Sequence, residues 1–186
     1  MSPKYIFVTI AGALLVGILA AGAALSAQDR FALKVPGGLA FSEFKGYETW
    51  QTISISHNGD KLAVILGNPT MIEAFKSGIP ENGKRFPDGA KMAKIHWLAK
   101  KNETAPGQPL VAGTLHDVDL MVKDSKRFAD SNGWGYAAFE YDIASDSFRP
   151  ANATDQPPQL NDAKCGAACH TAAFSRDYVF TEFPRR

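Results

Sequence analysis

Apolar and polar residues alternate along much of the chain, in short stretches that turn residues separate. Residues 49–56 largely alternate, the sequence His57-Asn58-Gly59-Asp60 favours a tight turn, and residues 62–66 are continuously apolar. This combination predicts a β-hairpin. Further strands are expected at residues 92–99, which lack a helical apolar stripe, at 110–122 and at 133–141, which are aromatic and β-prone. A last edge strand is expected at 178–183, which is aromatic and β-branched. In the strand at 92–99, the alternation places Met92, Lys94, His96 and Leu98 on one face.

Helical signals are few and short. Asn68 is suited to cap a helix, Pro69 to occupy its first position and Gly78 to follow its end, so a helix is expected over residues 69–77. A helical turn is expected at 125–129, and loops at 79–88 and 144–162. The whole pattern predicts a mainly β fold, in which an antiparallel sheet carries a few short helices.

The N-terminus has a different character from the rest of the chain. One lysine precedes an apolar run of about twenty residues that ends in small residues near Ala27, which is typical of an export signal. An uncleaved anchor in the inner membrane is the alternative, because the run is close to the length needed to span a bilayer. We therefore expect a signal peptide at 1–27 and one periplasmic domain at 28–186.

Charge and cysteine content narrow the function. The 20 Lys and Arg residues nearly balance the 19 Asp and Glu residues, and the basic residues are scattered, so nucleic acid is not an expected partner. The two cysteines, Cys165 and Cys169, lie within one five-residue window, which leaves none for a long-range disulfide. A local redox disulfide would need a βαβ context, and a zinc site would need more ligands.

The sequence Cys165-Gly166-Ala167-Ala168-Cys169-His170 predicts one covalently bound c-type haem near the C-terminus. The two thiols would form thioethers, with attachment through Cys169 alone as a variant, and His170 would be the proximal iron ligand. The motif is one residue longer than CxxCH. Its spacer contains only glycine and alanine, which can bulge without a steric penalty.

The sixth iron position decides between electron transfer and ligand chemistry, because an electron carrier fills it with Met or His. Each candidate also has a simpler structural explanation. The candidates are Met71, Met92, Met121, His57, His96 and His116. A β-rich chain with its haem motif near the C-terminus differs from the small helical electron carriers, and this difference favours an open position.

Several segments in the same order resemble the cytochrome P460 family. They are the sequence from Phe86-Pro87-Asp88-Gly89 to Lys94, the run 122–129, the aromatic strand from Trp134 and the C-terminal haem motif. The resemblance spans residues 47–183, and the extra motif residue departs from it. It implies a mainly β homodimer with a five-coordinate haem that oxidises hydroxylamine to nitrous oxide. Electrons would pass to a redox partner such as a soluble cytochrome c.

The resemblance also implies roles for individual residues. Lys94 matches the lysine whose side chain is bonded to a haem meso carbon, with Lys91 as the alternative. A distal carboxylate is expected within Leu160-Asn161-Asp162, where only Asp162 can act as a base. Glu140, on the aromatic strand, is a second candidate for proton transfer.

Two other functions remain open at this point. The related cytochromes c′-β bind nitric oxide, and the wholly aliphatic stretch 62–66 would suit such an apolar pocket. Phe75, Phe86 and Trp97 could then supply a hydrophobic cap, although aromatic residues at such positions are more often core. A simple electron-transfer cytochrome c is the third reading.

Overall fold

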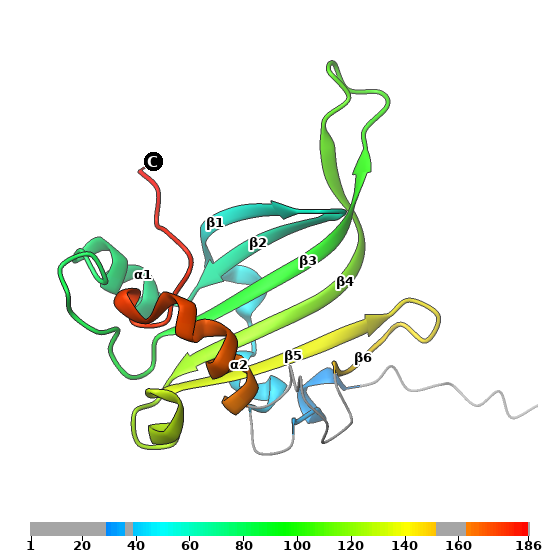
Figure 1. Cartoon of the computed structure of the whole chain (residues 1–186). Coiled ribbons are helices and arrows are strands. Elements are labelled where there is room, and N and C mark those ends of the chain that lie inside the picture. Colours follow the sequence, from blue (N-terminus) through cyan, green and yellow to red (C-terminus); the bar gives the residue numbers. More distant parts are fainter. Residues whose placement is uncertain (1–28, 36–38, 152–162, 186) are drawn as a thin grey trace, which may run out of the picture.

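The computed structural model describes residues 29–35, 39–151 and 163–185. Six strands form one sheet in chain order, and each strand is antiparallel to the next (Figure 1). The strands are β1 (Gln51–Asn58), β2 (Lys61–Gly67), β3 (Lys91–Lys101), β4 (Leu110–Lys123), β5 (Trp134–Asp142) and β6 (Ser147–Pro150). The predicted mainly β, antiparallel fold is therefore confirmed.

The predicted hairpin and its following helix are both present. β1 turns into β2 at Gly59, whose φ is +61°, a conformation that glycine adopts without strain. Helix α1 (Pro69–Lys76) begins where the Asn68 side chain accepts a 3.0 Å hydrogen bond from the backbone nitrogen of Met71. The chain leaves the helix at Gly78, with φ +87°. The local cap and turn signals thus act as the sequence predicts.

Near the C-terminus, α2 (Ala163–His170) contains the predicted haem motif and continues into the 3₁₀ helix η5 (Thr171–Arg176). In Figure 1, α2 lies across the sheet at β5. The approach is close, because a Cβ atom added at Gly166 would lie 2.3 Å from the Cβ atom of Tyr136. Within the described residues, no helix is long and apolar enough to span a bilayer.

The two faces of the sheet have separate cores. One face is covered by three 3₁₀ helices, η1 (Arg30–Ala32), η2 (Phe41–Phe44) and η3 (Tyr47–Thr49). The core on that face includes Phe41, Phe44, Ile95, Val118, Leu120 and Phe139. The other face packs against α1, α2 and the C-terminal segment, and its core includes Ile65, Met71, Met92, Met121 and Trp134.

Two expectations for the C-terminal half are wrong. Residues 179–185 are extended but pair with no strand, because the segment passes over the sheet face and Val179 packs into the core there. Within the expected loop at 144–162, residues 147–150 form β6. The aromatic pair Tyr141 and Phe148, opposite each other with ring centroids 5.3 Å apart, stabilises this added strand.

The expected turn at 125–129 is mostly confirmed. The carboxylate of Asp124 accepts hydrogen bonds from the backbone nitrogens of Lys126 and Arg127, at 3.2 and 3.0 Å. A short 3₁₀ helix, η4 (Ala129–Ser131), follows this turn and leads into β5. The chain is thereby brought back to the sheet edge at Trp134.

Candidate active site

A cavity of about 420 Å³ lies between the sheet and the C-terminal elements. Its size is within the range of small-molecule and cofactor sites. Residues of β2 to β5 form its floor, while α2 and residues 179–181 form its other wall. Charged and polar side chains of the floor are Lys61, Lys94, His96, Asp117 and Asp119.

His170, at the end of α2, enters this cavity with one ring nitrogen already engaged. Its Nδ1 lies 2.7 Å from the carbonyl oxygen of Tyr178, to which it donates when Nε2 carries no proton. Burial lowers the pKa of His170, the bond to Tyr178 opposes this shift, and the charge of Lys94 adds to it. The neutral imidazole therefore keeps Nε2 free as a ligand, an arrangement common among metal-binding histidines.

Aromatic rings hold His170 from two sides. The ring centroid of Tyr136 lies 4.7 Å and that of Phe180 5.0 Å from the imidazole centroid. The Tyr136 hydroxyl is buried and has no hydrogen-bond partner among the described residues. Because an unpaired buried hydroxyl is costly, this atom fits a bound group that brings a polar partner.

The second motif cysteine lies at the same cavity. Cys169 is exposed, unpaired and directly precedes His170. Positions 165 and 169 are one turn apart in the continuous helix α2, so the spacer forms helix instead of the bulge that its small residues would permit. Gly166 within the spacer is needed for another reason, namely the contact of α2 with Tyr136.

At the polar end of the cavity, Asp117 is bonded to two histidines, of which His96 lines the cavity. Asp117 accepts hydrogen bonds from the Nδ1 atoms of His96 and His116, the latter at 2.5 Å. A β-bulge at His116 allows both adjacent residues to reach this cluster. Burial alone would raise the pKa of Asp117, but the hydrogen bonds and charges of the two histidines hold it below its usual value. Asp117 is therefore ionised.

Asp119 behaves in the opposite way. Burial and the neighbouring charge of Asp117 raise its pKa from 3.8 to about 6. The side chain of Asp119 is 49% accessible and lines the cavity. The Nδ1 atom of His96 lies 3.8 Å from Asp119 Oδ2, and Lys94 is opposite Asp119 in the β3–β4 register. Two carboxylates with separated pKa values are a common arrangement for proton transfer.

The cavity fits a c-type haem, since it combines a neutral histidine with a free Nε2, a free thiol and an unpaired hydroxyl. The cytochrome P460 family model matches residues 44–181, about three quarters of the chain. The chain belongs to the cytochrome P460 family. It is accordingly a c-type haem protein. No curated protein sequence matches it.

Within this cytochrome P460 domain the two candidate lysines point to opposite faces. Lys94 lines the cavity that His170 enters. Lys91 donates a 2.6 Å hydrogen bond from Nζ to the carbonyl oxygen of Glu43, on the face covered by the N-terminal helices. An odd separation of three residues along β3 causes this difference. Lys94 alone of the two is placed to meet a haem.

Of the two predicted proton-transfer residues, the structure describes only Glu140. Asp162 lies outside the described residues. Glu140 is opposite Asp117 in β5, but its carboxylate pairs with Arg149 at 2.9 Å and does not line the cavity. Sequence reasoning missed Asp119. The alternation of Asp117, Asp119 and Met121 with apolar residues in β4 was the signal that could have found it.

The residues considered for the sixth iron position fall into two groups. Met92, Met121 and His96 line the cavity, whereas Met71, His57 and His116 do not. His96 is bonded to Asp117 through Nδ1, and both methionines pack in the core beside Trp134. The proposed aromatic cap is not present, because Phe75, Phe86 and Trp97 belong to the two cores.

Proposed function

We propose that this member of the cytochrome P460 family oxidises hydroxylamine to nitrous oxide at a five-coordinate haem in the periplasm. One observation carries the proposal: a carboxylate with a raised pKa, Asp119, shares the cavity with His170 and Lys94. A haem bound there supplies a coordination position and accepts electrons. The protein must supply the base, since hydroxylamine loses protons as it is oxidised.

Asp119 is suited to be that base. With a pKa of about 6 it is mostly ionised at neutral pH, yet it binds a proton more readily than an ordinary aspartate. Asp117 supports this role, because the two histidines keep it negatively charged and that charge raises the pKa of Asp119. His96, Asp117 and Asp119 also have the donor atoms of a metal site. The hydrogen bonds from His96 and His116, however, satisfy Asp117 without an ion.

Lys94 is proposed as the third covalent attachment to the haem, besides Cys165 and Cys169. Its amine lies in the same cavity as His170, where a neutral amine would add to an oxidised macrocycle as a nucleophile. The new C–N bond would replace a C–H bond of the ring, and the two protons and two electrons released would pass to solvent and to two molecules of the oxidised electron acceptor. A bond from Nζ to the macrocycle would fix the haem against β3. The electron acceptor would be a soluble cytochrome c, and the protein a homodimer in the periplasm, as the family resemblance implies.

The nitric oxide alternative is less well supported. Ile65 is the aliphatic contribution of β2 to the cavity, and Lys61 of the same strand also lines it. Four further ionisable side chains of β3 and β4 make this end polar, and the expected aromatic cap lies elsewhere. A site built only to bind a diatomic gas needs no such groups.

The decisive test is anaerobic turnover. The holoprotein is incubated with hydroxylamine and an artificial oxidant, and the headspace is analysed for nitrous oxide. We expect nitrous oxide in proportion to hydroxylamine consumed. Its absence, together with retained binding of nitric oxide, would reject the oxidase and select the alternative.

The lysine bond has a spectroscopic test. Wild type should show a strongly red-shifted Soret band when reduced, and Lys94→Ala should return it to the position of an ordinary c-type haem. Lys91→Ala is the matched control, because Lys91 lies on the other face of the same strand. An ordinary c-type spectrum in wild type would contradict the cross-link.

A further inference from the structure

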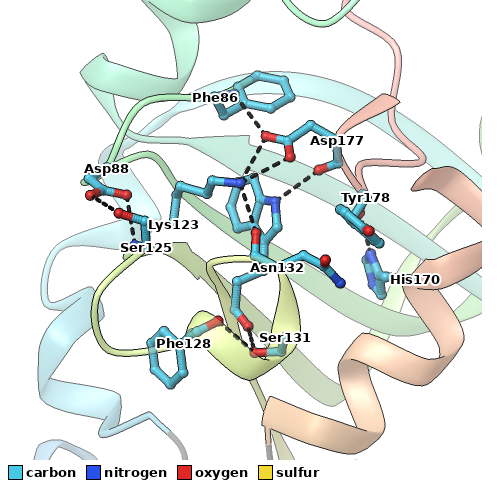
Figure 2. Close-up of polar contacts among 11 residues, drawn as sticks. Phe86, Asp88, Lys123, Ser125, Phe128, Ser131, Asn132, His170, Asp177 and Tyr178 are labelled. Carbon is cyan, nitrogen blue, oxygen red and sulfur yellow. Dashed lines mark hydrogen bonds and ion pairs between the residues drawn. The ribbon is translucent and has the colours of Figure 1, made fainter. Parts of the chain in front are cut away.

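An ion pair outside the cavity is buried almost completely. The side chains of Lys123 and Asp177 are only 5% and 3% accessible, and Lys123 Nζ lies 3.0 Å from both carboxylate oxygens (Figure 2). The pair joins the end of β4 to the segment that follows η5. The proposed chemistry uses neither residue. Since burying two charges carries a large desolvation penalty, such a pair is weak evidence for a purely stabilising role.

Hydrogen bonds from neighbouring segments hold both the side chain and the main chain of Asp177. Its carboxylate also accepts a 2.8 Å hydrogen bond from the backbone nitrogen of Phe86, and its carbonyl oxygen accepts one of 2.8 Å from Trp134 Nε1. Lys123 Nζ donates additionally to the carbonyl oxygen of Asn132 at 3.1 Å. It lies 4.9 Å from the centroid of a Trp134 ring. Main chain and side chain of Asp177 are thus held together.

What this network holds is an unusual turn. Asp177 and Tyr178 have φ values of +48° and +66°, and two successive residues without glycine in this region are uncommon and strained. The turn directs the carbonyl oxygen of Tyr178 to Nδ1 of His170, at 2.7 Å. Figure 2 shows the two contacts that this turn connects, that of Lys123 with Asp177 and that of Tyr178 with His170.

We propose that Lys123 and Asp177 are positioning residues for the iron ligand His170. By holding the strained turn, they fix the acceptor of the Nδ1 proton, and so the tautomer, orientation and donor strength of the imidazole. The inference rests on the proposed role of His170 as iron ligand. The charge pair would then tune how strongly His170 donates electrons to the haem iron, and it would act through the backbone carbonyl of Tyr178.

The test measures the iron–histidine bond directly. Resonance Raman spectra of the reduced, five-coordinate holoprotein report the iron–imidazole stretching frequency. The main variant is the double substitution K123M/D177N, because removing both charges avoids leaving one buried and unpaired. Asn at 177 keeps an acceptor for Phe86 and tolerates the left-handed backbone. We expect the stretch to shift to lower frequency or broaden, since a weaker Nδ1 bond makes the imidazole a poorer donor.

A second variant and a control complete the experiment. D177N alone keeps the Lys123 bond to Asn132 and should give a shift in the same direction. E81Q breaks the 3.0 Å pair of Glu81 with Arg176, the neighbour of Asp177, on the exposed surface. This control should leave the frequency unchanged.

The spectra distinguish a wrong iron ligand from a wrong positioning role of Lys123 and Asp177. A wild-type spectrum without an iron–imidazole band would reject His170 as the ligand, and the positioning role with it. A normal band whose frequency is the same in wild type, D177N and K123M/D177N would overturn the positioning role while leaving the proposed ligand intact. A shift equal to that in E81Q would overturn it too, because any disturbance of the segment would then produce the effect.

Discussion

The two faces of β3 and β4 differ sharply although they share one backbone. Towards the N-terminal helices β3 presents Ala93 and Ile95, which are buried among aromatic rings. Towards the cavity the same strand presents Met92, Lys94 and His96. The period of two along a strand therefore assigns stability to one face and chemistry to the other.

The comparison explains how this fold tolerates a polar cavity at its centre. We call the face that the N-terminal helices cover the closed face. There the ring of Phe41 packs against Phe31, Phe139 and Phe148, with ring centroids 4.7 to 5.9 Å apart. Such pairs add to the area that the rings bury. On the cavity face, Asp119 is held with a pKa far from its ordinary value, which is unfavourable for folding at neutral pH. The closed face compensates for the cost of the cavity.

The largest effect is expected on the closed face. Phe41→Ala removes a fully buried ring and should lower the free energy of unfolding by about 3–5 kcal/mol. Denaturant unfolding of the holoprotein measures this loss. The haem spectrum of the folded fraction should stay that of wild type, because Phe41 lies across the sheet from the cavity. Phe174→Ala, at a ring 69% exposed, is the control with little effect; a changed haem spectrum in Phe41→Ala would show that the faces are coupled.

The next effect concerns the cavity face. Asp119→Asn should lower the rate of hydroxylamine oxidation about 100-fold or more, as expected when a general base is removed. In wild type kcat/KM should rise as the pH rises through about 6, because the base must be deprotonated. Steady-state kinetics between pH 5 and 8 measure both. Glu140→Gln is the control, and a loss there equal to that in Asp119→Asn would move the base to Glu140.

Asp119→Asn should have the opposite effect on stability. The folded pKa, about 6, lies above the ordinary 3.8, so the folded protein keeps a proton that the unfolded chain releases. Stability contributed by this site therefore falls as the pH rises from about 4 to 6 and stays low above that. The variant should be more stable than wild type at pH 7.5 and lose this advantage at pH 4. Unfolding curves at the two pH values test the sign; equal differences would contradict it.

Much of the fold follows from local signals. Alternation, the lack of a helical stripe and β-prone aromatic composition located the four longest strands, and the cap at Asn68 located α1. The haem motif and Lys94 were likewise found in the sequence, since the motif is a short chemical pattern and Lys94 matches a family position. The 3₁₀ helices of the N-terminal segment are too short to show periodicity, and they depend mainly on packing against the sheet.

The polar end of the cavity follows less directly from local signals. Asp119 is distinguished by two neighbours: Asp117, two residues away on the same strand, and Lys94, which lies opposite it only through the β3–β4 register. The bulge at His116 shifts this register by one residue and cannot be seen in the pattern. The edge strand at 178–183 failed for a related reason, because the buried contact of Asp177 with Lys123 directs that segment over the cavity.

The smallest predicted effect concerns the contact of α2 with β5 at the edge of the cavity. Gly166→Ala would ordinarily stabilise a helix by up to about 1 kcal/mol. Here the new Cβ atom would lie 2.3 Å from both Cβ and Cγ of Tyr136, so α2 must move away from β5. We expect a net loss of about 1–3 kcal/mol, the usual cost of overpacking, measured by denaturant unfolding of the holoprotein.

The control is Ala168→Gly, at an exposed position of α2. It should also lose stability, but through helix propensity alone and without altering the haem spectrum. Because Tyr136 packs against His170, Gly166→Ala should alter that spectrum; a stabilised variant with an unchanged spectrum would show that α2 does not need its close contact with the sheet.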